Sequence, residues 1–464
     1  MKREIKSVLS LALSALVLTS FVACSGGAGN SSDSTAAATQ SVTSGNPDSQ
    51  SAAVKEPSEP TTIVFSALDC IGGEEKKKAQ DEWTITKLIR KFEQANPGVT
   101  VEIQIPADAS TAHATFKAAS LAGNGPDVAN LWSGQNIFML KDALLQLDDL
   151  IPDEDKPLFE NASAVHEGLK PDGKIWAYPF ISKNYGFFLY NKEIIKNAGL
   201  DFEANPPKTI AELEDAMTKI KALGVIPFYE DNIDCQLFFY GVGLWWQQLQ
   251  DPEKLMAEGE GKLKIADDPG FIKAFTTYQE LYSKGLINTN VASAKDRYQQ
   301  FYNGKAAIVA GGSWSIVDGV AAMGDKFGIM HFPDISEDAR IKDTSVGGIG
   351  ETLVASKRTE HPDLAVKLMS FLNSRDSELE LLKVLGGAPI RKDITLEDLG
   401  WQNDPIFTKL YGWGQKDVFP FPPAVIGTNA VNTISNMTVK VLTGKMTPAE
   451  LAELTDKVIA EANK

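Results

Sequence analysis

Aromatic and polar residues follow several segments of this sequence that are expected to form β-strands. Trp132 ends the run Pro126–Trp132, Trp314 closes the run Ala306–Trp314, and Asp69 follows the run Thr62–Leu68. A sugar ring offers an apolar C–H face and a rim of hydroxyl groups, so its binding site needs flat aromatic platforms surrounded by carboxylate and amide groups. In an open α/β sheet, ligands bind where strands end. The pattern therefore favours a carbohydrate-binding cleft.

The candidate ligand-binding residues lie at or just after strand-like runs rather than inside helical stripes. Core packing is the alternative interpretation for each tryptophan. Core packing is the preferred interpretation for Trp83 and Trp176. Trp401 and Trp413 lie among Gly and Pro, and for these two both roles stay open. The candidates are Asp69, Trp132, Gln135, Asn184, Tyr185, Glu230, Asp231, Trp245, Trp246, Trp314, Gly348 and Trp413.

Motifs of catalysis and of metal binding are weak in this chain. The four histidines, His113, His166, His331 and His361, show no HxxxH or HExxH spacing, and we expect no metal site and no cofactor. No GxSxG nucleophile elbow occurs, and the glycine-rich segment around Gly348 lacks the Lys-Ser/Thr of a phosphate-binding loop. Glu230, Asp231 and Asp234 cluster after a strand-like segment, and a pair of such carboxylates could hydrolyse a glycosidic bond only at a suitable separation.

Length and composition limit the class of protein. A chain of 464 residues exceeds what one hydrophobic core usually supports, so we expect two lobes. The formal net charge of -16 would repel phosphate backbones, which argues against a nucleic-acid partner. The three cysteines, Cys24, Cys70 and Cys235, show no CxxC or framework spacing.

The N-terminal segment has the features of an export signal. Lys2, Arg3 and Lys6 precede an apolar run from Val8 to Val22, and a small residue stands before Cys24. The pattern indicates a lipoprotein signal peptide over residues 1–23, with lipid carried by Cys24 after cleavage. An uncleaved anchor is the alternative. Residues 24–60 are rich in Ser, Thr, Ala and Gly and are expected to form a disordered tether.

The rest of the chain alternates strand and helix signals. Thr62–Leu68, Val99–Ile105 and Pro126–Trp132 read as strands separated by helices, and this order predicts a parallel sheet. Thr209 followed by Glu212 predicts a capping box at the start of a helix. In Pro171–Leu200 two strand signals flank the polar tripeptide from Ser182 to Asn184, which we interpret as a crossing between lobes.

Seven segments of the chain resemble the extracellular solute-binding proteins of ABC importers, specifically the branch of maltose-binding and multiple-sugar-binding proteins. They follow the order of that family through most of the chain after residue 60. The segments are KFEQANPGVTVEI (Lys91 to Ile103), LAGNGPDVANLW (Leu121 to Trp132), DGKIWAYPF (Asp172 to Phe180), LYNKEIIKNAGLD (Leu189 to Asp201), PPKTIAELEDAMTKIKALGVIPF (Pro206 to Phe228), FYNGKAAIVAGGSW (Phe301 to Trp314) and Glu351 to Ile394.

The resemblance implies an α/β fold of two lobes, the type II periplasmic-binding-protein-like fold, which closes on ligand in a cleft between lobes joined by a hinge. The expected N-lobe comprises residues 61–184 and 352–388, and the expected C-lobe residues 185–351 and 389–464. By position, Asp69 lies in the family's loop after the first strand and Trp132 matches its first-lobe aromatic residue. Asn184 and Tyr185 match the first hinge crossing, Glu230 falls in an acidic and aromatic loop of the second lobe, and Trp314 matches a tryptophan that stacks on sugar. Asn184 in place of an acid, and Cys70 and Cys235, depart from the family pattern.

The leading hypothesis is an exported, lipid-anchored, non-enzymatic, monomeric receptor that captures a mono- or oligosaccharide and delivers it to the permease subunits of an ABC transporter. It would lie on the outer face of the cell membrane, or in the periplasm of a host with two membranes. Two alternatives stay open. One is a surface glycosidase with a carboxylate pair near Glu230, and the other is a binding protein for a polyamine or a metal chelate.

Overall fold

The computed structural model describes residues 60–107, 109–160, 162–232, 237–342, 346–415 and 422–462. The predicted signal peptide, the lipidation site at Cys24 and most of the predicted tether lie outside these residues, as do Asp234 and Cys235. No helix among the described residues has the length and apolar character needed to cross a membrane.

The described strands form one mixed sheet in the order β2-β1-β3-β8-β4-β6-β5, with β7 paired to β4. Most residues of β3 to β7 are buried, as expected for a sheet covered by helices on its faces, whereas β1 and β2 each bury only two of their six residues. The strands are β1 (Thr61–Ser66), β2 (Val99–Gln104), β3 (Val128–Trp132), β4 (Tyr178–Asn191), β5 (Ile226–Tyr229), β6 (Ala306–Gly312), β7 (Phe327–Met330) and β8 (Val346–Ala355).

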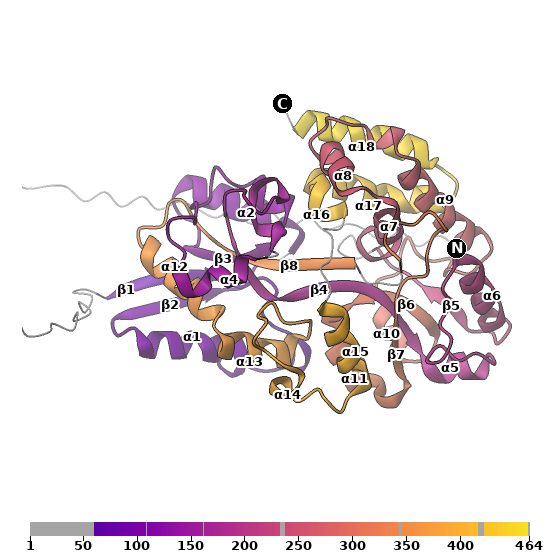
Figure 1. Cartoon of the computed structure of the whole chain (residues 1–464), viewed down its shortest axis with the longest axis horizontal. Helices are drawn as coiled ribbons and strands as arrows, with labels where there is room; N and C mark the ends of the chain where they lie inside the picture. The colour runs from indigo at the N-terminus through magenta and orange to yellow at the C-terminus, as the bar shows by residue number, and fades with distance from the viewer. Residues whose placement is uncertain are drawn as a thin grey trace, which may run out of the picture. The chain divides into compact units, whose positions relative to one another are not determined.

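The first three strands pair in parallel, as the alternation of strand and helix signals predicts. Parallel pairing needs crossover connections, and α1 (Thr84–Ala95) and α2 (Ala109–Ala122) supply them. In Figure 1 these two helices lie on opposite sides of the strands. The helix α1 buries Ile85, Leu88 and Phe92, the spacing of one helical face.

Two long strands run through the centre of the sheet and connect its two halves. β4 pairs with β8 from Tyr178 to Gly186 and with β6 from Gly186 to Tyr190, while β8 also pairs with β3. All three of these pairings are antiparallel, so the sheet is mixed rather than parallel throughout. Figure 1 shows β4 and β8 side by side between the two groups of strands.

The predicted crossing at Ser182 is a single continuous strand and not two strands separated by a loop. The register between β4 and β8 shifts between Phe180 and Lys183, and Ile181 has a positive φ of 64°. An irregularity of this kind bends a strand without ending it. The polar tripeptide therefore marks a bend in β4. In the sequence, the same polar residues suggest an interruption between two strands.

The helices cover the sheet and build two further layers of packing. They are α3 (Gln135–Phe138), α4 (Lys156–Phe159), α5 (Lys192–Asn197), α6 (Ile210–Lys221), α7 (Gly243–Leu249), α8 (Pro252–Gly259), α9 (Pro269–Ser283), α10 (Arg297–Tyr302), α11 (Ile316–Met323), α12 (Pro362–Leu372), α13 (Arg375–Leu385), α14 (Leu396–Leu399), α15 (Pro405–Gly414), α16 (Pro422–Ile426), α17 (Thr428–Leu442) and α18 (Pro448–Ala462). A π-helix, η7 (Phe238–Val242), leads directly into α7.

The buried apolar residues fall into separate clusters on the two sides of the central strands. One cluster holds β1, β2, β3, α1 and the first residues of β4, and we call the part built on it the first lobe. Two other clusters hold the end of β4 with β5, β6 and β7 and the helices α6, α7, α9 and α17, and we call this part the second lobe. Residues contributed by both lobes can therefore meet only near the central strands.

Candidate functional site

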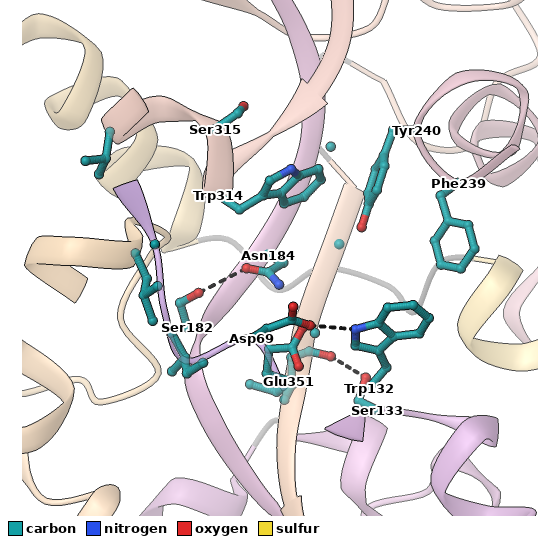
Figure 2. Close-up of a pocket in the computed structure, with 18 of the residues that line it drawn as sticks. Asp69, Trp132, Ser133, Ser182, Asn184, Phe239, Tyr240, Trp314, Ser315 and Glu351 are labelled. Carbon is teal, nitrogen blue, oxygen red and sulfur yellow. Dashed lines mark hydrogen bonds between the residues drawn. The ribbon is translucent and has the colours of Figure 1, made fainter. Parts of the chain in front are cut away.

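A cavity of about 430 Å³ lies beside the central strands and is lined by residues of both lobes. A volume of this size is typical of sites for small organic ligands. Figure 2 shows the aromatic rings around it, with the acidic side chains of Asp69 and Glu351 between them. The lining residues used below are Asp69, Lys76, Trp132, Ser133, Ser182, Asn184, Phe239, Tyr240, Tyr298, Tyr302, Trp314, Asp318, Gly348, Gly350 and Glu351.

Asp69 and Trp132 are held together on the first lobe. The indole Nε1–H of Trp132 donates a hydrogen bond of 2.9 Å to Asp69 Oδ2. The backbone N–H of Asp69 donates to Asn130 Oδ1 at 2.9 Å, so the loop after β1 is tied to β3. These contacts fix both the carboxylate and the indole at the edge of the cavity, where the carboxyl ends of two neighbouring parallel strands meet.

Glu351 of β8 lies next to this pair, and the sequence reasoning did not select it. Its Oε2 accepts a hydrogen bond of 3.1 Å from Asn130 Nδ2, and the Oδ1 of the same asparagine accepts the backbone N–H of Asp69. Burial first, and then the negative charge of Asp69, raise the pKa of Glu351 well above its ordinary value. Glu351 lies in the middle of β8, whereas the sequence favours site residues at or after strand ends, so the sequence alone gives no sign of its position.

His113 of α2 supports Trp132 from behind. The backbone N–H of Trp132 donates to His113 Nε2 at 3.0 Å, and the ring centroids of the two residues are 5.4 Å apart. Burial lowers the pKa of His113 to about 4, so the imidazole is neutral and Nε2 accepts the hydrogen bond. This histidine has a structural role, as its isolated position in the sequence predicts.

Trp314 forms a second aromatic wall on the second lobe. It follows β6 in a tight turn, and its ring centroid lies 4.2 Å from that of Tyr240. A Cβ atom at Gly312 would lie 2.1 Å from the indole ring, closer than atoms can approach. The glycine before the turn is therefore needed for Trp314 to lie over the end of the strand.

Asn184 projects from the bend in β4 into the same cavity (Figure 2). Its Oδ1 accepts a hydrogen bond of 3.0 Å from Ser182 Oγ, which orients the amide. A Cβ atom at Gly350 would lie 2.3 Å from Asn184 Nδ2. The absence of a side chain at Gly350 thus leaves room for the amide group, whose nitrogen is available as a donor.

The π-helix η7 supplies two aromatic residues that the sequence reasoning did not select, Phe239 and Tyr240. Both line the cavity, and their ring centroids are 5.8 Å apart. π-Helices are rare in proteins, and those that do occur are often found at functional sites. Burial and the charge of Glu351 raise the pKa of Tyr240, so its hydroxyl stays protonated and can donate a hydrogen bond.

Glu230 and Asp231 lie behind the cavity and are not among the residues that line it. Glu230 is fully buried, and its side chain accepts a hydrogen bond from the Tyr278 hydroxyl. The backbone N–H of Glu230 donates to Asn288 Oδ1 at 2.6 Å. Burial raises the pKa of Glu230 to about 8. Asp231 accepts a hydrogen bond of 3.0 Å from the backbone of Arg297, at the start of the helix that carries Tyr298 and Tyr302.

The tryptophans Trp245 and Trp246 lie in the helix α7 and not after a strand, which corrects the expectation for this segment. Both are 0% exposed in the core of the second lobe. The helix is buried on nearly all sides, from Gly243 to Gln248, and such a segment is hard to distinguish from a buried strand in sequence. Their N–H groups donate to Pro333 O and to Asp268 Oδ2. Neither indole is among the residues lining the cavity.

Three other candidates are not among the residues that line the cavity. Tyr185 is fully buried, and its hydroxyl donates to Gly414 O at 3.2 Å. Trp413 packs against His331, with ring centroids 3.9 Å apart. Gln135 is half-buried at the start of α3. The structure therefore brings five of the twelve candidates to one cavity, namely Asp69, Trp132, Asn184, Trp314 and Gly348.

Contacts between the two lobes stand beside the cavity. The rings of Trp132 and Phe239 meet edge to face with centroids 6.3 Å apart, and Thr428 Oγ1 donates to Asn136 Oδ1 at 2.6 Å. The groups that face a ligand thus come from both lobes, and a ligand bound there would touch both. Such a ligand favours the arrangement in which the lobes are close together.

Comparison with known proteins agrees with this architecture. The chain is 25% identical over 343 residues to the putative ABC transporter periplasmic-binding protein YcjN of Escherichia coli strain K12, covering 69% of this chain and 73% of that protein. It is 23% identical over 331 residues to the sn-glycerol-3-phosphate-binding periplasmic protein UgpB of Shigella dysenteriae, covering 69% of this chain and 75% of that protein. The solved structure of a chitin oligosaccharide binding protein superposes with a TM-score of 0.72 at 21% identity, covering 86% of this chain and 99% of that one.

The model of one protein family matches residues 87–409. This range includes every described strand except β1, among them the central strands β4 and β8, and most residues of the cavity. The expected two-lobe α/β fold of solute-binding proteins is thus confirmed. The chain belongs to the bacterial extracellular solute-binding proteins.

Proposed function

We propose that this protein captures a mono- or oligosaccharide in the cavity between its two lobes and delivers it to the permease of an ABC importer. The observation that carries the proposal is the meeting of aromatic rings and hydrogen-bonding side chains from both lobes around one cavity of about 430 Å³. Trp132 comes from the first lobe, and Tyr240 and Trp314 come from the second. The proposed lobes are residues 61–184 with 352–388 and residues 185–351 with 389–464.

The chemistry of the cavity matches a sugar. The rings of Trp132, Tyr240 and Trp314 offer faces for the C–H surface of a pyranose, and Asp69, Asn184 and Glu351 offer donors and acceptors for its hydroxyl groups. The fold neighbour reported above is named for a chitin oligosaccharide, which supports the same ligand class.

A phosphate ester fits this cavity less well, although one relative is named for sn-glycerol 3-phosphate. The charged side chains that line the cavity are Asp69, Asp318, Glu351 and Lys76, and no arginine is among the described lining residues. Phosphate groups are usually bound by arginine or lysine clusters or by helix N-termini. An excess of carboxyl groups would repel a phosphate dianion.

The geometry also speaks against a glycosidase. Glu230, the residue on which that alternative depends, is fully buried behind the cavity. Asp69 and Glu351, two of the three residues with carboxyl groups that line the cavity, lie so close that, in addition to burial, the charge of Asp69 raises the pKa of Glu351. Glycosidases hold their two carboxyl groups about 5 to 9.5 Å apart, which leaves room for the scissile bond or for a water molecule. We therefore propose a binding protein without catalytic activity.

The proposal includes export and attachment to a membrane. The family is extracellular, and the predicted signal peptide ends before Cys24. We propose that lipid on Cys24 anchors the protein as a monomer at the outer face of the cell membrane, or in the periplasm of a host with two membranes. Replacing Cys24 with serine should move the protein from the membrane fraction to the soluble fraction, and an unchanged distribution would contradict the anchor.

A titration of tryptophan fluorescence tests the ligand class. The protein is titrated with a panel of mono- and oligosaccharides, with sn-glycerol 3-phosphate and with a polyamine. Saturable change with at least one sugar supports the proposal, because Trp132 and Trp314 line the cavity. A response to the phosphate ester or the polyamine alone would contradict it.

A further inference from the structure

Arg297 is a buried arginine beside the aromatic residues of the cavity. It is the first residue of α10 and is 3% exposed. It is not among the residues that line the cavity, whereas Tyr298 and Tyr302 of the same helix are. A guanidinium group stays charged in proteins, and burial of a charge is costly unless the charge is paired and hydrogen-bonded. The contacts of Arg297 must therefore account for its position.

Asp231 holds Arg297 with both of its carboxylate oxygens. Oδ2 accepts the backbone N–H of Arg297 at 3.0 Å, and Oδ1 accepts a guanidinium N–H from Nη1 at 3.4 Å. The side chains of this ion pair are each 4% exposed, so solvent screens the interaction little. Asp231 thus fixes both the start of α10 and the direction of the guanidinium group.

The same guanidinium group contacts the side chain of Tyr298. Its Nη2 donates a hydrogen bond to the Tyr298 hydroxyl oxygen at 3.4 Å, and its central carbon lies 4.7 Å from the centre of the phenol ring. A cation over an aromatic face is attracted by the electrons of the ring. The ring of Tyr302 lies nearly parallel to that of Tyr298, with centroids 6.1 Å apart. Arg297 and Tyr302 therefore hold the Tyr298 ring in one orientation.

The contact with Arg297 also determines how the Tyr298 hydroxyl can bond to a ligand. Arginine only donates hydrogen bonds, so the Tyr298 oxygen is the acceptor in this contact. The O–H proton of Tyr298 must then point to a different group. Because Tyr298 lines the cavity, this proton can be donated to a molecule bound there.

We propose that Arg297 is a positioning residue that makes Tyr298 a hydrogen-bond donor toward the cavity. Asp231 acts on ligand binding through Arg297 and without contact to the ligand. The inference rests on the proposed function, since it concerns how the same cavity selects its ligand. It assigns to the ligand an acceptor oxygen opposite Tyr298. The hydroxyl groups and ring oxygen of a sugar supply such an acceptor, whereas the ammonium groups of a polyamine cannot accept a hydrogen bond.

Tyr298→Phe is the first test, because it removes the hydroxyl group and leaves Arg297 and Asp231 in place. Maltotriose and chitotriose are the probes, and calorimetric titration measures their Kd. The Kd of the tighter-binding probe should rise about fivefold in Y298F, the effect of one hydrogen bond. Tyr411→Phe is the matched control, because the Tyr411 hydroxyl donates to the Ile394 carbonyl at 3.0 Å and Tyr411 does not line the cavity. Equal Kd values in Y298F and Y411F would overturn the proposal.

Arg297→Lys tests whether Arg297 acts through Tyr298. Lysine keeps the positive charge but lacks the planar group that bonds to Asp231 and Tyr298 together. The Kd should rise about fivefold in R297K, and adding R297K to Y298F should change the Kd by less than twofold, because the two residues act as a unit. Losses that multiply in the double variant would overturn the proposal. Thermal melting shows whether R297K is folded, and the Y298F result decides alone if it is not.

NMR spectra recorded without ligand separate this inference from the proposed function. The chain has 10 tyrosines, and carbon-13 at Cζ gives each of them a signal. The Tyr298 signal is the one that is absent in Y298F. It should shift in R297K but not in the control Arg391→Lys, since Arg391 bonds to Asp393 and does not line the cavity.

The two kinds of measurement fail in different ways. If the Tyr298 signal shifts in R297K but neither probe binds to the wild type, the proposed function fails for these sugars while the positioning of Tyr298 by Arg297 stands. If the signal is the same in R297K and in the wild type, Arg297 does not position Tyr298, and the inference is refuted even where a sugar binds.

Discussion

The indole N–H of Trp132 lies 2.9 Å from Asp69 Oδ2, and this hydrogen bond joins an aromatic wall of the cavity to its acidic centre. The two residues are 63 positions apart in sequence and meet because β1 and β3 are parallel neighbours. The carboxylate holds the ring plane, and the ring in turn limits where the carboxylate can point. A ligand thus meets both groups in a fixed arrangement.

Replacing Trp132 with phenylalanine tests this arrangement. The aromatic face is retained, but the hydrogen bond to Asp69 is lost, so we expect sugar binding to weaken by about 1 kcal/mol. Isothermal titration calorimetry measures the change. Trp83→Phe is the matched control, because Trp83 does not line the cavity and its indole bonds to the backbone carbonyls of residues 75 and 78. Equal sugar affinities of W132F and W83F would show that the hydrogen bond between Trp132 and Asp69 does not contribute to binding.

Trp314→Ala should have a larger effect, because it removes a complete aromatic ring from the residues that line the cavity. We expect Trp314→Ala to weaken sugar binding by about 1 to 3 kcal/mol, the range of aromatic anchors in binding sites. Trp314→Phe should recover part of this loss. The same calorimetric titration applies, with thermal melting to confirm that the variants are folded. Wild-type affinity in W314A would exclude Trp314 from the site.

Gly350→Ala tests the position of the Asn184 amide without changing Asn184 itself. The new Cβ would lie 2.3 Å from Asn184 Nδ2, so the amide must move out of the cavity. We expect a loss of affinity of about 1 kcal/mol, the usual value of one hydrogen bond. Gly412→Ala is the control, since a Cβ there meets no atom within 4 Å. If G350A binds as G412A does, Asn184 makes no contact with the ligand.

Trp246 should matter for stability and not for binding. Its fully buried ring packs against Phe271 with centroids 5.0 Å apart, and its N–H donates to Asp268 Oδ2. We expect Trp246→Ala to lower the free energy of unfolding by about 3 to 5 kcal/mol. Denaturant unfolding measures the loss, and titration of the folded fraction should give the wild-type Kd. A loss of sugar affinity without a loss of stability would show that Trp246 takes part in binding.

Buried Glu230 predicts a dependence of stability on pH. Its pKa is raised to about 8 in the folded protein, whereas in the unfolded chain it returns to about 4.3. Between these values the folded state binds more protons, so stability is greatest at low pH and is lost as pH rises toward 8. Glu230→Gln should flatten this slope in thermal melts, and the exposed Asp215→Asn should not. An identical slope in E230Q would show that Glu230 is not the source.

The part of the fold that local patterns determine could be predicted from sequence. The Thr209 and Glu212 side chains form the expected capping box, and β1, β2 and β3 pair in parallel as their alternation with helices indicates. Trp132 and Trp314 reach one cavity because each stands at the end of a strand, and β3 and β6 run in opposite directions on the two sides of the central strands. These features depend on residues that are close in sequence or on the rule that strand ends carry sites.

The other features depend on long-range packing. Glu351 reaches the cavity only because β8 pairs with both β3 and β4, and nothing in its sequence neighbourhood indicates this. The π-helix presents Phe239 and Tyr240, while Trp245 and Trp246 a few residues later enter the core. An apolar segment in which every position suits burial does not reveal which residues face a cavity. Glu230 likewise follows a strand but points behind the cavity, a direction set by tertiary contacts.

A crystal structure of the protein with its tightest-binding sugar tests the central claim most directly. The account predicts a sugar ring against Trp314 or Trp132, with its hydroxyl groups hydrogen-bonded to polar side chains that line the cavity, such as Asp69 or Asn184. A sugar bound elsewhere, or in this cavity without contact to either tryptophan, would contradict the account.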